Sequence, residues 1–114
     1  MDRHARQVRL AGVGAEGQAR IARTVIDIPL AGLAAEVAAR YLAGAGVAAL
    51  RVEDPVAGDA ARAVDSRVKI DVTPGLPPEP FDPPLEIRDP VARSVAVGAL
   101  VALRALNAAL GDTS

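Results

Sequence analysis

The residues that come nearest to a chemical site lie at positions 25–34, which read V-I-D-I-P-L-A-G-L-A. A strand that enters a helix through G-x-G-x-x-G binds phosphate, because backbone N–H groups and the positive helix end can approach the anion closely. At the three glycine positions this chain has Pro29, Ala31 and Ala34, and only Gly32 lies among them. Proline lacks an N–H, and each alanine adds a methyl group where the phosphate would sit. The sequence therefore predicts that this loop does not hold a phosphate.

An acidic pair, Glu53 and Asp54, ends the apolar run that follows the loop. In a dinucleotide or ATP fold, an acid about 20 residues past the glycines holds ribose hydroxyls. The alternative interpretation is that these two residues are only the polar end of a strand. Gly32 and Asp54 are thus the candidate cofactor-binding residues, as vestiges of a nucleotide site, and no bound cofactor is expected.

The elements that must position these residues predict a minimal Rossmann-like α/β fold, with a parallel sheet flanked by helices and a long C-terminal helix. Strands are expected at 24–28 and 47–53, parallel because the helix between them supplies the crossover. Residues 68–72 alternate apolar and polar side chains, which predicts a strand at a sheet edge. Residues 1–114 are expected to form a single domain made of an N-terminal helical arm (1–23), a βαβ-type core (24–72), a proline-rich connector (73–89) and a C-terminal helix (90–110).

The last helix has strong local signals, with Asp89 as N-cap, Pro90 in the first turn and Gly111 as the stop. Its apolar residues extend around much of the circumference, so the helix must be covered on most sides. Two explanations remain open, a dimer interface or complete burial within the chain. The candidate interface residues are Val95, Gly98, Ala99, Leu103 and Leu106.

Three stretches carry a resemblance to a known family. Residues 3–10 read R-H-A-R-Q-V-R-L, residues 14–18 read G-A-E-G-Q, and residues 39–47 read A-R-Y-L-A-G-A-G-V. These resemble the R-[YH]-x-R-Q-x-x-L, G-x-x-G-Q and A-x-Y-L-A-x-A-G-V-G patterns of the ThiF/MoeB/HesA family. Members are ubiquitin-activating-type adenylyltransferases, which use ATP to activate the C-terminus of a ubiquitin-like protein. The resemblance covers residues 3–54 and fails at the phosphate-contacting glycines.

Beyond Asp54 the chain departs from the family pattern. The S-N-L-x-R-Q run and the catalytic cysteine are missing, and Lys69 is the only lysine. Residues 90–110 resemble the family's closing helix. The resemblance therefore implies a truncated, catalytically inactive pseudo-adenylyltransferase that serves as a dimerisation or scaffolding module. No catalytic residue and no metal ligand is expected.

Arg6 is the candidate for a role in trans. The resemblance implies that the second arginine of the opening motif reaches the triphosphate held by a partner protomer. Such an arginine stabilises phosphate charge without a nucleotide pocket of its own. The expected partner is then a second copy, an active adenylyltransferase-family protein or a ubiquitin-like protein. The alternative is that Arg3 and Arg6 only pair with acids such as Glu16 or Glu36.

A second hypothesis is a small nucleotide- or metabolite-binding protein, or an enzyme, that uses the crevice beyond the carboxyl ends of the strands. Its candidate ligand-binding residues are Asp27, Asp54, Asp71 and Arg62. His4, the only histidine, is expected to pack rather than to catalyse. A third hypothesis is a subunit of a larger assembly.

The composition excludes several classes of function. A net charge of -1 gives no basic field for nucleic acid, and the absence of cysteine excludes disulfides and thiolate catalysis. The uncharged apolar run at 95–103 is well short of the ~20 residues that span a bilayer, and no signal peptide is recognised at the N-terminus. We expect a soluble cytoplasmic protein from a bacterial host.

Overall fold

The sheet is built from three short parallel strands. The computed structural model describes residues 14–77 and 86–111, and within them the strands are β1 (Val25–Ile28), β2 (Ala49–Val52) and β3 (Lys69–Val72). Their order in the sheet is β1-β2-β3, so β2 is central. Both strand pairs are parallel, which confirms the predicted α/β class with a parallel sheet.

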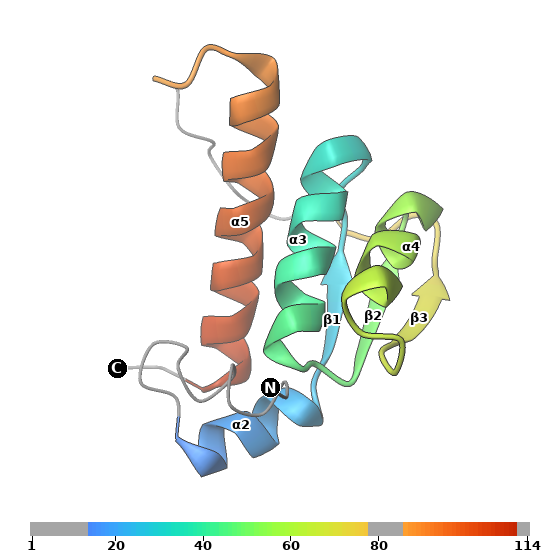
Figure 1. Ribbon diagram of the computed structural model, residues 1–114, viewed down its shortest axis with the longest axis vertical. Coiled ribbons are helices and arrows are strands. Elements are labelled where there is room, and N and C mark those ends of the chain that lie inside the picture. The colour runs from blue at the N-terminus through green and yellow to red at the C-terminus, as the bar shows by residue number, and fades with distance from the viewer. Residues whose placement is uncertain (1–13, 78–85, 112–114) are drawn as a thin grey trace.

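The helices gather on one side of this sheet. The crossover helices α3 (Gly32–Ala45) and α4 (Pro55–Val64) lie on the same face of the strands (Figure 1). This placement follows because successive right-handed crossovers that advance in one direction put their helices on one face. The long helix α5 (Pro90–Ala109) runs along α3, and α2 (Ala15–Ala22) lies at the C-terminal end of α5.

Two of the helices begin with the same pair of residues, aspartate followed by proline. The carboxylate of Asp54 accepts the N–H of Val56 at 3.1 Å at the start of α4, and that of Asp89 accepts the N–H of Ala92 at 2.8 Å at the start of α5. Each aspartate thereby satisfies a backbone donor that has no partner inside the helix. The capping predicted for Asp89 is confirmed.

The core lies between the strands and the three helices. Ile28, Leu42, Leu50 and Val52 are its largest fully buried side chains. The face of α3 that covers them is mostly alanine, and small side chains let the helix lie close to the sheet. The radius of gyration is 13.5 Å, near the ~13 Å expected of a globular domain of this length.

The contact between α3 and α5 is especially close at Gly98. A Cβ atom at this position would lie 2.4 Å from the carbonyl oxygen of Ala34 and 2.8 Å from the Cβ of Val37. Real Cβ atoms do not approach other atoms so closely, so only glycine fits. Gly98 therefore fixes the distance between the two helices.

Several element boundaries differ from those expected. The sequence at 59–65 predicts a helical turn, whereas α4 begins at Pro55 because Asp54 caps it. The strands are shorter than the runs 24–28 and 47–53. The sequence at 85–88 predicts a short edge strand, but residues 86–88 are not in a strand. The short helix that the sequence predicts at 3–10, within the N-terminal arm, lies outside the described residues.

Candidate functional site

The two candidate cofactor-binding residues are joined directly. The backbone N–H of Gly32 donates a hydrogen bond to one carboxylate oxygen of Asp54 at 2.9 Å, while the other oxygen accepts the N–H of Val56. Gly32 is the first residue of α3 and has a φ of 63°, a left-handed conformation that favours glycine. One side chain thus bridges the N-termini of two helices at the carboxyl edge of the sheet.

These hydrogen bonds keep Asp54 ionised. The N–H of Gly32, and to a lesser extent that of Val56, holds the pKa of the Asp54 carboxyl below its ordinary value of 3.8. A fixed negative charge therefore lies at the first N–H of α3, where a nucleotide phosphate would otherwise be bound. It both occupies a donor and repels a second anion.

The loop next to this carboxylate is uncovered within the described residues. A Cβ atom built on Gly32 would meet nothing within 4 Å, and Ala31 is exposed. No neighbouring side chain of the described residues therefore covers the loop at Gly32. The obstacles to phosphate are local, namely the charge of Asp54, the missing N–H of Pro29 and the methyl groups of Ala31 and Ala34.

A row of charged side chains crosses the sheet on the face away from the helices. Strand register places Asp27 beside Arg51 and Arg51 beside Asp71. Arg51 binds Asp27 through two hydrogen bonds, Nε to Oδ1 at 2.7 Å and a terminal nitrogen to Oδ2 at 2.9 Å. This pairing lowers the pKa of Asp27 and raises that of Arg51, and Asp71 adds a smaller electrostatic contribution to the latter. We call these three residues the charged row.

Arg51 was not among the candidate residues, although the sequence contains the signal for the charged row. The strands read V-I-D-I, A-L-R-V and K-I-D-V, so each alternates apolar and polar or small residues. Such alternation is typical of a sheet with one face covered and one face open. Strands covered by helices on both faces read instead as continuous apolar runs.

The four residues of the metabolite-binding hypothesis do not converge on one site. Asp27 and Asp71 belong to the charged row, Asp54 caps α4, and Arg62 lies on α4 beside a shallow groove toward β3. In the described ranges, no three histidine, cysteine or acidic residues are grouped closely enough to hold a metal ion.

The candidate interface residues of α5 divide into two groups. Gly98 and Leu106 are buried, and the helix that approaches Gly98 is α3 of the same chain, so these two residues do not lie on an exposed surface. Val95 and Leu103 remain 42% and 49% exposed, and Ala99 is partly buried. Because Val95, Ala99 and Leu103 are spaced four apart, they form one line along the helix, which we call the α5 stripe.

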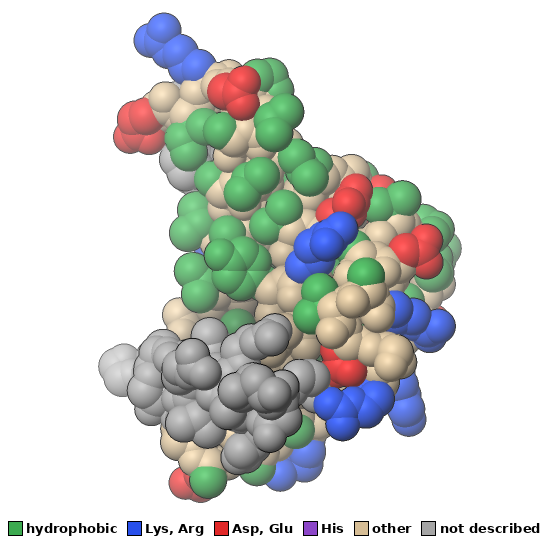
Figure 2. All heavy atoms as spheres, in the orientation of Figure 1, with side chains coloured by type: hydrophobic (Ala, Val, Ile, Leu, Met, Phe, Trp, Pro, Cys, Tyr) green, Lys and Arg blue, Asp and Glu red, His purple; other side chains and the backbone are tan. Residues whose placement is uncertain are grey.

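The α5 stripe borders an apolar depression. A pocket of about 380 Å³ lies between α3 and α5, and Leu103 lines it together with Tyr41, Gly44 and Leu106. Hydrophobic side chains gather over α5 on the face drawn in Figure 2. Exposed apolar side chains next to such a pocket are typical of a surface that contacts another protein.

Helix α5 is also, within the described ranges, the one helix long and apolar enough to cross a membrane by length and composition. Core helices of globular proteins meet the same criteria. Val101, Ala102 and Leu106 of this helix are buried within the chain, and Arg93 and Arg104 interrupt its sequence.

Comparisons with known proteins give no match: no family model matches the chain, and neither does any curated protein or solved structure. Arg6 and His4 lie outside the described residues, so the arrangement around the trans-acting candidate is not part of the site described here.

Proposed function

We propose that this protein is a non-catalytic α/β module of the ThiF/MoeB/HesA type, which acts through protein contacts and not through nucleotide chemistry. The resemblance of residues 3–54 to that family suggests the type, and the hydrogen bond between Gly32 and Asp54 carries the functional argument. A pseudo-adenylyltransferase keeps the fold of the family but does not bind phosphate at the junction between its first strand and the following helix.

Electrostatics supports this proposal. Asp54 is ionised at neutral pH, as aspartates ordinarily are, and two backbone N–H groups lower its pKa further. A triphosphate would have to displace this carboxylate and would then lie beside it, a like-charge contact that is unfavourable. The only lysine, Lys69, is on β3, and the chain has no cysteine for a thioester.

The protein contacts of this proposal lie on the α5 stripe. Val95 and Leu103 expose apolar surface next to the pocket between α3 and α5, and a second copy or a related protein can cover both. The resemblance suggests an active family member, to which Arg6 would contribute in trans, or a ubiquitin-like protein as the partner. We propose that the protein makes these contacts in the cytoplasm.

Calorimetry with Mg-ATP tests the nucleotide half of the proposal. We expect no saturable binding with a Kd below about 1 mM, because Asp54 occupies the helix end. The Asp54→Asn variant removes the charge and the Asp71→Asn variant removes a matched charge from the open sheet face, so any gain in affinity should appear only in the former. Submillimolar binding by the unmodified chain would instead favour the metabolite-binding hypothesis. Stabilisation by a nucleotide or small metabolite in a thermal-shift screen would point the same way.

A further inference from the structure

The helix layer is wider than the sheet it covers. Helix α3 lies between α4 and α5 and packs against both, and β1 forms one edge of the sheet (Figure 1). Packed helices are spaced ~10 Å apart and strands ~4.8 Å apart, so three helices span about 20 Å where three strands span about 10 Å. Helix α5 consequently extends past β1 by about the width of two strands.

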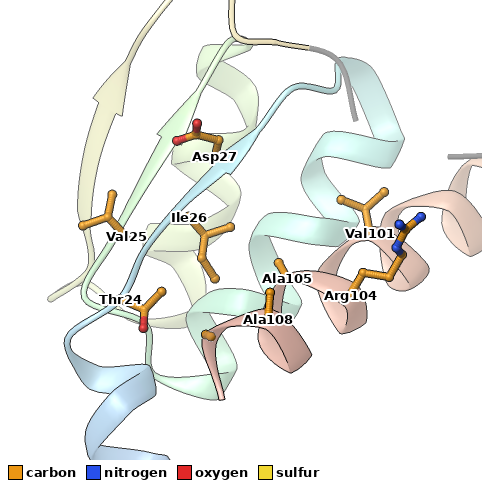
Figure 3. A pocket seen from close by; sticks show the side chains of 9 residues that line it. Thr24, Val25, Ile26, Asp27, Val101, Arg104, Ala105 and Ala108 are labelled. Atoms are coloured by element: carbon orange, nitrogen blue, oxygen red, sulfur yellow. The ribbon is translucent and has the colours of Figure 1, made fainter. Parts of the chain in front are cut away.

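A groove occupies this space. It has a volume of about 400 Å³, and its walls are the edge of β1 and the side of α5 that faces it (Figure 3). On the α5 wall Val101, Ala105 and Ala108 are small and apolar, and Arg104 adds one positive charge. On the β1 wall Val25 is 56% exposed. The groove therefore offers apolar contact on one side and strand backbone on the other.

The backbone of β1 has hydrogen-bonding groups that point into the groove. The N–H of Ala49 donates to the carbonyl of Thr24 at 3.4 Å, which places the groups of Thr24 on the β2 side. Successive residues of a strand direct their N–H and C=O to opposite sides, so those of Val25 and Asp27 are directed away from β2. No strand in residues 14–77 or 86–111 pairs with this edge. An unpaired edge is a template for another strand.

The charged row indicates which side chain fits beside β1. Along it the charges are negative at Asp71, positive at Arg51 and negative at Asp27, where the row ends at the sheet edge. Opposite charges on neighbouring strands stabilise a sheet, and like charges destabilise it. A fourth strand next to β1 is therefore favoured if it places a lysine or arginine beside Asp27.

We propose that the groove between β1 and α5 binds an extended segment of a partner protein, which pairs with β1 as a fourth strand. Its alternate residues are apolar and contact α5, and one of its intervening residues is a lysine or arginine that lies beside Asp27. This surface is distinct from the α5 stripe, and the proposal does not depend on the resemblance or on nucleotide binding.

Pairing of β1 with β1 of a second copy does not fit this groove. If β1 paired with β1 of another copy, the ~10 Å spacing of helices would place α5 of one copy where α3 of the other lies. The occupant must be a strand without its own helix on that side. An extended peptide meets this requirement, and strand addition at a free edge is a common mode of peptide recognition.

The test uses the full-length, isotope-labelled chain and a short synthetic peptide that alternates valine and arginine. We expect saturable binding, with NMR shift changes and slower amide exchange at Val25 and Asp27. A peptide in which glutamate replaces arginine should bind at least about tenfold more weakly. A valine–arginine peptide with N-methylated backbone amides should not bind, because it cannot donate to the β1 carbonyls. Equal binding of the three peptides, or shift changes confined to the α5 stripe, would overturn the proposal.

Two variants on α5 give a matched comparison. Ala108 is exposed and lines the groove, so Ala108→Phe should fill it and weaken peptide binding at least about tenfold. Ala92 is exposed on the same helix outside the groove, so Ala92→Phe should leave binding unchanged. Unchanged binding in a folded Ala108→Phe protein would contradict the proposal, as would self-association that Ala108→Phe abolishes. If that variant does not fold, the NMR shift changes and amide exchange at Val25 and Asp27 in the unmodified chain still test whether the peptide pairs with β1.

Discussion

At the residue scale, Asp54 shows how one side chain can replace a ligand. Its carboxylate accepts the N–H of Gly32, a backbone group of the kind that binds phosphate at helix N-termini. Because the carboxylate belongs to the chain, its effective concentration at the helix end greatly exceeds that of any free anion. The same side chain caps α4, so its position is fixed by two elements.

Acid should destabilise the protein through Asp54 and Asp27. Both carboxyl groups have pKa values below 3.8 in the folded chain, Asp54 through backbone N–H bonds and Asp27 through Arg51. Their contribution to stability is complete above the unfolded-state pKa and is lost as the pH falls through the lower folded-state values. We expect a constant Tm from about pH 7 to pH 5 and a decline below about pH 4.

The Asp27→Asn/Asp54→Asn double variant provides the comparison. It should have a lower Tm at neutral pH and a shallower acid decline, and the single variants should divide the effect between the two sites. Circular dichroism melts across the pH series measure it. A double variant with the same acid decline as the unmodified protein would show that these carboxylates do not control acid stability.

The sequence predicted Gly32 and Asp54 as a pair but could not assign the role of the aspartate. Asp54-Pro55 and Asp89-Pro90 carry the same helix-start signal. For Asp89 the sequence suggested only a helix N-cap. For Asp54 its distance along the chain from the loop also suggested that it binds a ribose. Whether the Asp54 carboxylate accepts the N–H of Gly32 or binds a ribose depends on the distance between β1 and β2. This distance is set only when the sheet folds.

At the scale of elements, the pair α3 and α5 depends on glycine at position 98. The helices contact each other along much of their length, and the carbonyl of Ala34 lies where a Cβ of residue 98 would be. The small side chains of α5 around Gly98 allow another helix to approach closely, and in the structure that helix is α3 of the same chain.

Alanine substitutions at two helical glycines should have opposite effects. Gly98→Ala introduces a Cβ 2.4 Å from the Ala34 carbonyl oxygen and should destabilise the fold by about 1–3 kcal/mol. Gly44→Ala places its Cβ 3.8 Å from Val64, an ordinary contact, and should stabilise α3 by about 0.5–1 kcal/mol.

Urea unfolding of both variants measures the difference. Gly44→Ala is the control for an added methyl group on a helix, in the last turn of α3, where the new Cβ makes only an ordinary contact. If Gly98→Ala were as stable as Gly44→Ala, the close approach of α3 and α5 would be wrong.

The sequence predicted most elements because their signals are local. The Asp-Pro start of α5 and the turn at Gly46, which has a φ of 94°, act within a few residues. Strand order depends instead on contacts between distant residues. The open sheet face was predicted only for 68–72, because the alternation in β1 and β2 extends over just four residues each.

At the scale of the whole molecule, the fold is a half-covered sheet with a small core. Within residues 14–77 and 86–111 the helices protect one face only, and the charged row on the other face is compatible with water. A chain of 114 residues buries a smaller fraction of its surface than a larger domain does. Association with another protein is one way to add buried apolar area, and the α5 stripe is the surface suited to it.

Leu103→Glu tests whether a second copy covers the α5 stripe, because it should separate such a dimer. Leu103 is 49% exposed and lines the pocket between α3 and α5, so a glutamate there can reach water in the monomer but would be buried at an interface. We expect the unmodified protein to dimerise in light scattering and the variant to be monomeric, with little change in the fold. Ala108→Glu, at an exposed position of the same helix that lines the groove beside β1 and not the α5 stripe, is the control and should remain dimeric. A monomeric unmodified protein at high concentration, or a dimer that Leu103→Glu leaves intact, would remove the α5 stripe as the homotypic interface and leave a different partner as its occupant.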